Sequence, residues 1–271
     1  MWMTSPAALS AAIRDPAAET AFARLLAGSR LGRPVRAFAA AGSTMDVAHA
    51  WAAGGAPEGA LVVAARQEQG RGRLGRTWLS PEGGLYCSLI LRPQRPAAEV
   101  PQLSLVAGLA AAEAVRDAAG VYPSIRWPND LLVRNRKLAG ILTEARGGAV
   151  VVGLGINIAA DPAQLPDGAT SLAAESAGHV SREDVLARLC GRLSAWYDTW
   201  SSQGFAPVRE ALRPWIGLFG QPVHLTSGTQ RLEGVAQDVD AQGRFVVRLE
   251  AGIVRAFDMG EVALLRGASC E

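Results

Sequence analysis

Apolar residues along the chain fall into two patterns, short uniform runs and longer segments with helical spacing. The Ala- and Leu-rich segment from Pro101 to Ala119 has the length and spacing of a helix. Two further helices are predicted from their first residues, one from Asp15 as N-cap before Pro16, the other from Ser43 as N-cap with the acid Asp46 three residues on. Short apolar runs bounded by turn residues predict strands. We expect strands over residues 35–40, 61–66, 85–91, 124–127, 131–133, 138–144 and 150–158, and two or three helices between residues 181 and 218.

The pattern changes at residue 220, where helical spacing gives way to brief strands with glycine-containing turns. Five such strands in close succession predict a small barrel. We place them at residues 222–226, 230–237, 244–249, 253–258 and 262–265. The chain is therefore divided into an α/β domain over residues 1–219 and a small β domain over residues 220–271.

Composition restricts the class of protein. Of the 271 residues, 49% are apolar and 19% are charged, as in a globular protein, and the net charge of +2 argues against a general binder of nucleic acid or membrane surfaces. No signal peptide is visible, and no apolar stretch is long enough to span a bilayer. Cys87, Cys190 and Cys270 are too widely spaced for a zinc site or a disulfide framework. We expect a cytoplasmic protein.

The basic residues are almost all arginine, because Lys137 is the single lysine among 27 basic residues. This imbalance suggests a coding bias against lysine. Arginine replaces lysine readily as a surface charge, but not where a compact point charge must fit a tight site. Lys137 is therefore a candidate functional residue on composition alone.

A glycine- and arginine-rich loop has the G-x-G-x-x-G spacing of a dinucleotide fold over residues 70–75. We reject that interpretation, because Thr77-Trp78 and the residues after it do not begin a helix, as that fold requires. Glycines that permit close backbone approach, with Arg71, Arg73 and Arg76 between and after them, suit a phosphate or a carboxylate. A solvated basic turn is the alternative.

A second segment joins two predicted strands through Asn129 and Asp130. A carboxylate there would help to hold Mg²⁺ with substrate phosphates, whereas an ordinary Asn-Asp turn is the alternative. Glycines such as Gly140 mark places where a ligand would lie against bare backbone. His49 and His224 have no partners at ligand spacing, so we expect packing or solvent exposure for both.

Together these motifs resemble the biotin–protein ligase family over about residues 35–265. The combination is more specific than any of its parts. It consists of Ser43-Thr44, Gln67, the loop from Gly70 to Trp78, Trp127-Pro128-Asn129-Asp130, the segment from Lys137 to Leu142, and Gly153-x-Gly155-Ile156-Asn157.

The resemblance implies a fold and a two-step reaction. The fold is a mixed, largely antiparallel sheet with flanking helices, similar to class II synthetases, followed by an SH3-like barrel. Biotin and MgATP would give biotinyl-5′-adenylate, and a lysine of a biotin carboxyl carrier protein would then attack it. Mg²⁺ would be the cofactor and biotin and ATP the substrates. Because the nucleophile comes from the acceptor, the enzyme would act by positioning and by charge stabilisation.

The resemblance also assigns residues to biotin. Ser43, Thr44 and Gln67 would hold the ureido end. Arg71 would lie over biotin and its activated carboxyl, and Lys137 would neutralise charge between that carboxylate and the α-phosphate. The complete set of implied biotin residues is Ser43, Thr44, Gln67, Gly70, Arg71, Gly72, Lys137 and Gly140, and the implied catalytic residues are Lys137, Arg71 and Arg73.

A second set is implied for ATP and the adenylate. Trp78 would pack on the adenine, with Asn157 near it. Arg73 would approach the phosphate, and the loop would order over the intermediate and shield it from water. The full set is Arg73, Arg76, Trp78, Asn129, Asp130 and Asn157, with Asp130 as the candidate Mg²⁺ ligand.

The sequence departs from the family pattern at three positions. Met45 stands where the family has Asn, so the role of that Asn is lost or moved. Arg126 replaces a common Lys, and Leu74 replaces an Arg of some relatives. Relatives that double as repressors carry an N-terminal winged-helix domain. Only 42 residues precede Ser43, with one predicted helix, so we expect no repressor role and no DNA binding.

Two alternatives remain from the sequence. A lipoate-type ligase or octanoyltransferase would share the fold, but the transferases need a reactive Cys beside a Lys, and Cys190 is expected in the core. A non-catalytic biotin-sensing or nucleic-acid-binding module would use the loop arginines on phosphates. The oligomeric state is open, with a homodimer through an exposed sheet edge as one arrangement.

Overall fold

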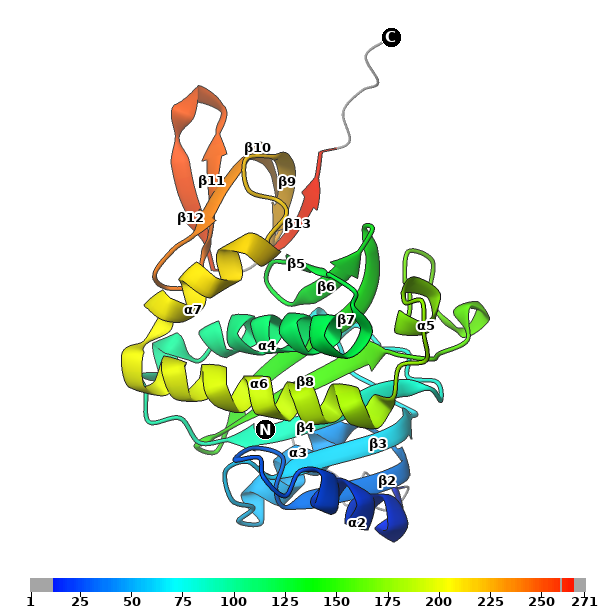
Figure 1. Ribbon diagram of the computed structural model, residues 1–271. Coiled ribbons are helices and arrows are strands. Elements are labelled where there is room, and N and C mark those ends of the chain that lie inside the picture. Colours follow the sequence, from blue (N-terminus) through cyan, green and yellow to red (C-terminus); the bar gives the residue numbers. More distant parts are fainter. Residues whose placement is uncertain (1–11, 259, 266–271) are drawn as a thin grey trace.

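The computed structural model describes residues 12–258 and 260–265 and shows two sheets with helices around the larger one (Figure 1). The helices are α2 (Pro16–Leu25), α3 (Thr44–Ala53), α4 (Gln102–Ala119), α5 (Leu172–Glu175), α6 (Arg182–Gln203) and α7 (Phe205–Leu212). The strands of the larger sheet are β1 (Ile13–Arg14), β2 (Val35–Ala41), β3 (Leu61–Gln67), β4 (Gly84–Leu91), β5 (Ser124–Arg126), β6 (Asp130–Val133), β7 (Arg136–Arg146) and β8 (Ala149–Asn157).

The larger sheet has eight strands in the order β1-β2-β3-β4-β8-β7-β6-β5. All its pairs are antiparallel except β2 with β3. Helices α4 and α6 lie side by side on one face, and α3 packs on the other (Figure 1). The expected α/β class with a mixed, largely antiparallel sheet is therefore confirmed.

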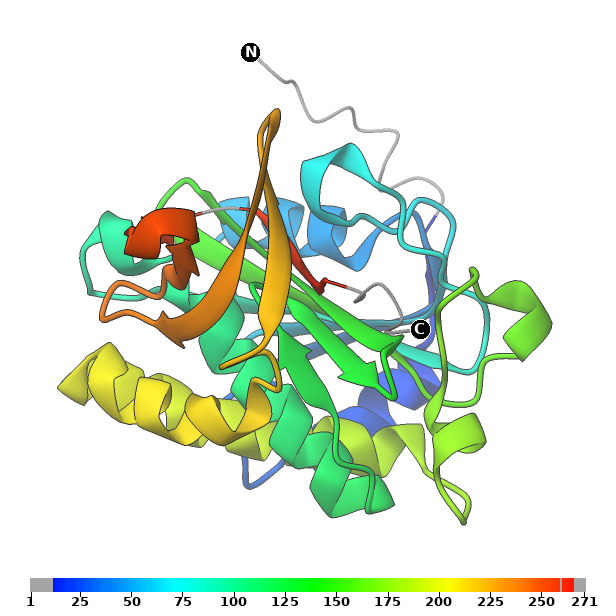
Figure 2. The ribbon, with the colours of Figure 1, turned by 90° about the horizontal axis from the view of Figure 1, so that it is seen from above.

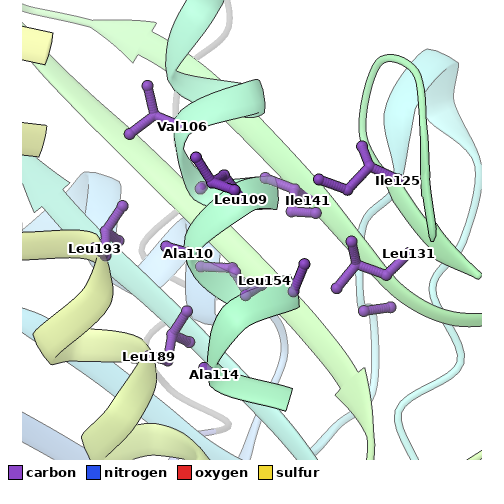
Figure 3. Close-up of a cluster of buried hydrophobic side chains, with 14 of the residues drawn as sticks. Val106, Leu109, Ala110, Ala114, Ile125, Leu131, Ile141, Leu154, Leu189 and Leu193 are labelled. Atoms are coloured by element: carbon purple, nitrogen blue, oxygen red, sulfur yellow. The ribbon is translucent and has the colours of Figure 1, made fainter. Parts of the chain in front are cut away.

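The main core lies between the sheet and the α4–α6 pair (Figure 3). Leu109 of α4 and Leu189 of α6 are fully buried there, and Ile141 of β7 and Leu154 of β8 meet them from the sheet. Gly120 ends α4 in the left-handed conformation, which glycine adopts without steric cost. A second, smaller core forms beneath α3.

The C-terminal part forms a five-stranded antiparallel sheet in the order β12-β11-β10-β9-β13. Its strands are β9 (Pro222–Ser227), β10 (Gln230–Val239), β11 (Phe245–Leu249), β12 (Val254–Phe257) and β13 (Glu261–Leu264). Within the described residues the outer strands β12 and β13 do not pair with each other. The sheet is therefore open and is not closed into the expected barrel. It lies at the end of the larger sheet that carries β5 and β6 (Figures 1 and 2).

Trp127, the residue after β5, joins the two sheets. Its Nε1 donates to the carbonyl of Gly243 at 3.0 Å, and its ring stacks on Phe245 with centroids 5.5 Å apart. Phe245 in turn stacks on Phe219, at the end of the helical segment. The smaller sheet is therefore anchored directly beside the turn that carries Asn129 and Asp130.

Most elements expected from the sequence are present, with bounds shifted by one to three residues. Asp15 caps α2 as predicted and accepts a hydrogen bond from the backbone of Ala18 at 3.0 Å. The short elements β1 and α5 were not predicted, because two to four residues carry no usable periodicity. Within the described chain, no helix has the length and apolar character needed to cross a membrane.

Candidate active site

Side chains along β8 point alternately to the two faces of the sheet, and on the face opposite α4 this leaves space for a cavity. Val152 and Leu154 belong to the main core, so Gly153 and Gly155 point to the other face. Gly140 of β7 pairs with Gly155. Because these positions lack side chains, there is room above the sheet for side chains of other segments and for a cavity.

The resulting cavity has a volume of about 470 Å³, within the usual range for small-molecule sites. It crosses the sheet from Gln67 on β3 to Asp130 on β6, with β4, β8 and β7 between them. It brings together twelve predicted site residues: Ser43, Thr44, Gln67, Arg71, Gly72, Arg73, Arg76, Trp78, Asn129, Asp130, Lys137 and Gly140.

A neutral hydrogen-bond network forms one end of the cavity. Gln67 Oε1 accepts from the backbone and hydroxyl of Thr44 at 2.8 and 3.0 Å, and Gln67 Nε2 donates to Ser80 Oγ at 2.8 Å. Ser88 Oγ donates to Thr44 Oγ1 at 2.8 Å. The Gln67 oxygen is therefore used within the protein, which keeps its amide in one orientation.

Ser43 and Met45 complete this end. Ser43 occupies the N-cap position of α3, but its side chain makes no capping bond, so the predicted capping role is wrong. Its buried hydroxyl has no hydrogen-bond partner within the described residues, which leaves it available to a bound molecule. Met45 is buried, and its Sδ fills the space that a side chain at Gly153 would need.

Charged side chains form the other end of the cavity. Asp130 Oδ2 accepts from Arg126 Nη2 at 2.6 Å, and its Oδ1 lies 2.7 Å from Lys137 Nζ. Asn129 uses Nδ2 to donate to the carbonyl of Ile141 at 2.8 Å, so its Oδ1 faces Arg73 Nη1 at 3.2 Å. Burial lowers the pKa of Arg73, which stays protonated because a guanidinium titrates far above neutral pH. The excess of cations suits an anionic ligand.

Asp130 also meets what a nucleotide-bound magnesium ion requires of a protein. Mg²⁺ in such sites takes one or two carboxylates and completes its shell with phosphate oxygens and water. Asp130 Oδ1 is buried, and its contact with Lys137 lacks hydrogen-bond geometry. No group of three or more His, Cys, Asp or Glu side chains able to hold a metal occurs within residues 12–258 and 260–265. The carboxylate therefore fits an ion whose other ligands come from the substrate.

The glycine- and arginine-rich loop is a small hairpin over the cavity. Trp78 donates its backbone N–H to Gly70 at 2.9 Å, and Gly72 donates to Arg76 at 2.7 Å. The tip turns at Leu74, whose φ of 56° is unusual for a residue with a side chain. Leu74 is exposed, and Gly75 after it has a φ of 74°, which glycine adopts readily, so the chain turns back sharply at the tip.

The indole of Trp78 lies on the glycine pair of the sheet. A Cβ at Gly155 would stand 2.4 Å from Trp78 Nε1, and one at Gly140 would stand 3.0 Å from its Cζ3. Lys137 Nζ lies 5.2 Å from the ring centroid. Trp78 covers Gly140 in this structure, and a ligand contact with bare backbone at Gly140 stays a prediction.

Two predicted site residues do not line the cavity. Asn157 is buried at the end of β8, and its Nδ2 donates to the carbonyl of Thr170 at 3.0 Å. Gly70 lies at the base of the hairpin, where a Cβ would stand 2.4 Å from the carbonyl oxygen of Trp78. Gly70 is therefore required by the close approach of the two hairpin arms, which is a structural reason.

Sequence reasoning missed a cluster beside the hairpin. Glu144 Oε2 lies 3.0 Å from His49 Nε2 and 2.9 Å from Arg71 Nη2, and that Nη2 is 3.2 Å from Asp46 Oδ1. The hydrogen bond with His49 is the main cause that lowers the pKa of Glu144, and Arg71 adds to it. His49 is buried, which is one of the two outcomes expected for it, but its partner is almost a hundred residues away in the sequence, so no local signal revealed it.

The smaller sheet also contributes to the cavity. His224, Thr226 and Arg231 line it, and Arg76 of the hairpin pairs with Glu261 Oε1 at 2.5 Å. Only the packing of the two sheets brings these residues to the site.

The cysteines of the described chain are not candidate nucleophiles. Cys87 and Cys190 are buried in the main core, and burial raises the pKa of both thiols, that of Cys190 to about 12. A buried thiol stays protonated at neutral pH and is a poor nucleophile. The expected packing role of Cys190 is confirmed.

Two families match parts of the sequence. Residues 38–161 match the biotin/lipoate A/B protein ligase family, and residues 218–265 match the biotin protein ligase C terminal domain.

Curated proteins and solved structures are similar over longer stretches. A biotin--[acetyl-CoA-carboxylase] ligase of Mycobacterium tuberculosis is 32% identical over 94% of this chain and 98% of its own length. One from Paracoccus denitrificans is 37% identical over 71% of this chain and 85% of its own. A biotin protein ligase from Aquifex aeolicus, in complex with biotin and ATP, superposes with a TM-score of 0.77 at 30% identity, over 86% of this chain and 99% of that one.

Proposed function

The chain belongs to the biotin protein ligase family, and on that premise we propose that it activates biotin with ATP and transfers it to a lysine of a biotin carboxyl carrier protein. The observation that carries the proposal is a single cavity with a neutral hydrogen-bonding end and a cationic end. Biotin has a neutral ureido ring and a carboxylate, and ATP adds phosphates. The two ends therefore match the two kinds of group that must meet.

The first step would join the biotin carboxylate to the α-phosphorus of ATP. A carboxylate oxygen forms the new bond to phosphorus, the bond to the β-phosphate oxygen breaks, and pyrophosphate leaves. Lys137 and Arg73 are the cations best placed to lower repulsion between these anions, because both line the cationic end. The Ser43 hydroxyl would bind the ureido ring, while Thr44 and Gln67 hold the shape of that pocket.

The second step would transfer biotin to the acceptor. The lysine nitrogen of the carrier attacks the anhydride carbonyl, the bond to the phosphate oxygen breaks, AMP leaves, and the nitrogen loses its proton to solvent. This chain needs no nucleophile of its own for the step, in keeping with its buried thiols. The hairpin over residues 70–78 would cover the anhydride and limit hydrolysis.

Magnesium belongs to the proposal. When bound with ATP it would shield the phosphate charge, and Asp130 would be the protein carboxylate that holds it. Arg126 keeps the Asp130 side chain in place through Oδ2. Asp130→Asn is expected to raise the Mg²⁺ concentration needed for half-maximal ATP binding, measured by fluorescence titration of the purified protein.

The test of the function is exchange of labelled pyrophosphate into ATP. We expect exchange that depends on biotin and Mg²⁺, and transfer of biotin to a purified biotin carboxyl carrier domain, detected by its mass. Lipoate and octanoate serve as parallel substrates. Exchange with lipoate alone would move the protein to the lipoate-type alternative, and no exchange with any acid would favour a binding module.

The resemblance to the family also implies a site for the adenine ring. We propose that the face of Trp78 turned away from Gly155 stacks on the adenine ring. The Nδ2 of Asn157 is used by Thr170, so its Oδ1, which is buried and has no partner within the described residues, would be the atom that faces the adenine. The protein is expected in the cytoplasm, where ATP is abundant, and sedimentation of the purified chain would test whether it forms a homodimer.

A further inference from the structure

Glu144 lies where three parts of the cavity wall meet. It is on β7, it accepts from the hairpin residue Arg71, and it contacts His49 of α3. The same helix begins with Thr44 at the neutral end of the cavity. A single carboxylate therefore links the sheet, the helix and the hairpin behind the site.

The contact holds Arg71 by one end of its guanidinium. Nη2 is shared between Glu144 Oε2 at 2.9 Å and Asp46 Oδ1 at 3.2 Å. The Nε–H of Arg71 is buried and has no acceptor within residues 12–258 and 260–265. Arg71 lines the main cavity, so this orientation leaves a donor free for a bound anion while the terminal nitrogen is fixed.

His49 holds Glu144 in turn. The imidazole is only 4% exposed, and its Nε2 lies 3.0 Å from Glu144 Oε2. Because the histidine side chain is almost fully buried, it limits the rotamers of Glu144 more than solvent would. The chain of contacts runs from a buried histidine to Arg71, which lies in the first arm of the hairpin.

We propose that Glu144 is a positioning residue, held by His49, that fixes the guanidinium of Arg71 and anchors the stem of the hairpin over residues 70–78. The hairpin tip has its own contacts, through Arg73 with Asn129 and Arg76 with Glu261. Besides the backbone hydrogen bonds of the stem, the side chain of Arg71 ties the stem to Glu144 of β7 and Asp46 of α3. The catalytic part of this inference rests on the proposed function, whereas the anchoring part does not.

Limited digestion with trypsin tests the anchoring without any reaction. Trypsin cleaves after arginine, and the hairpin offers Arg71, Arg73 and Arg76. We expect cleavage at these bonds to be faster in Glu144→Gln than in the wild type by about tenfold, identified by fragment mass. Glu68→Gln is the matched control, because that carboxylate lies beside the hairpin but pairs with Arg66 at 3.6 Å. Equal rates in wild type and Glu144→Gln would overturn the proposal.

A double-mutant cycle tests the positioning. The quantity is kcat/KM for biotin in pyrophosphate exchange, for Arg71→Ala, Glu144→Ala and the double variant. In Glu144→Ala, kcat/KM is expected to fall roughly ten- to a hundredfold, the range found when a residue that orients a metal ligand is removed. The double variant should lose no more than Arg71→Ala alone, because Glu144 acts only through that arginine.

The outcomes separate the two proposals. Losses that multiply in the double variant would mean that Glu144 has an independent structural role, and the inference would be wrong. Absence of biotin-dependent exchange in the wild type would defeat the proposed function, while the trypsin result would still decide the anchoring. Glu144→Gln, which keeps the size of the side chain, replaces Glu144→Ala in the cycle if the alanine variant does not fold.

Discussion

The indole of Trp78 stands so close to Gly155 that a Cβ on the glycine would lie 2.4 Å from Nε1. Such a distance is shorter than any relaxed contact, so the indole can occupy this place only because residue 155 has no side chain. Gly140 on the neighbouring strand serves the same ring. The glycine pair is a platform for an aromatic side chain that we propose stacks on adenine.

Gly155→Ala is therefore expected to displace Trp78 and weaken ATP binding. The KM for ATP in pyrophosphate exchange should rise about tenfold, because stacking of a base on an aromatic ring contributes about 1–3 kcal/mol. The control is Gly191→Ala, at a helical position where nothing lies within 4 Å of the new Cβ. It should leave the KM unchanged. An unaltered KM in Gly155→Ala would show that the indole does not bind the nucleotide.

Lys137→Arg is expected to fold normally and to lose adenylate formation. Lys137 Nζ sits between Asp130 Oδ1, at 2.7 Å, and the Trp78 ring, at 5.2 Å, and the wider guanidinium does not match that space. Biotin-dependent pyrophosphate exchange measures the loss, and thermal unfolding checks the fold. Full activity in the variant would mean that any cation suffices and that the single lysine has no special role.

Trp127→Phe is expected to weaken the link between the two sheets. The variant loses the hydrogen bond from Nε1 to Gly243, at a cost of about 1 kcal/mol, but keeps the stack on Phe245. Because Asn129 and Asp130 follow in the same turn, the KM for ATP should also rise severalfold. Chemical denaturation and exchange kinetics measure the two effects.

The control for that variant is Trp196→Phe. The Nε1 of Trp196 donates to Glu113 at 2.8 Å, far from any cavity residue, so stability should fall by a similar amount with unchanged kinetics. Equal kinetic effects in both variants would indicate a general loss of stability and would remove the special role of the contact between the sheets.

The stability contributed by Glu144 is expected to depend on pH. Its pKa is held below the ordinary value of 4.5, first by the hydrogen bond with His49 and then by Arg71. A carboxylate with a depressed pKa in the folded state stabilises the fold above its unfolded-state pKa and loses that contribution as pH falls through the folded-state value. Glu144→Gln should therefore be less stable than wild type at neutral pH, by about 1–2 kcal/mol.

As pH falls below the ordinary carboxyl pKa, the difference in stability between the two proteins should shrink. Urea denaturation from about pH 7 down to about pH 3.5 follows the difference across that window. A difference that stays constant at low pH would mean that the charge of Glu144 does not stabilise the fold and that the glutamine simply packs less well.

The resemblance to the family pointed to most residues at the two ends of the cavity, and the sequence alone predicted the order of most helices and strands. Local patterns sufficed for this, because burial on one face imposes a period on each element and the turn residues mark its ends. The motif set around Lys137 and Asp130 also identified the family, since its parts keep their order and spacing. The sequence also indicated where the loop over residues 70–78 lies, but it did not predict the hairpin shape of that loop or the contact between Arg71 and Glu144.

Tertiary structure alone decided which partners the functional side chains meet. Glu144 joins His49 and Arg71 across separations of 95 and 73 residues, and no local period relates such positions. Packing likewise placed the Trp78 indole against Gly155 and the Asn157 side chain against the carbonyl of Thr170. It also left the hydroxyl of Ser43 without the capping hydrogen bond expected from the sequence. Hydrogen bonds and close contacts between distant segments depend on how the layers are stacked, and that arrangement exists only once the whole chain has folded.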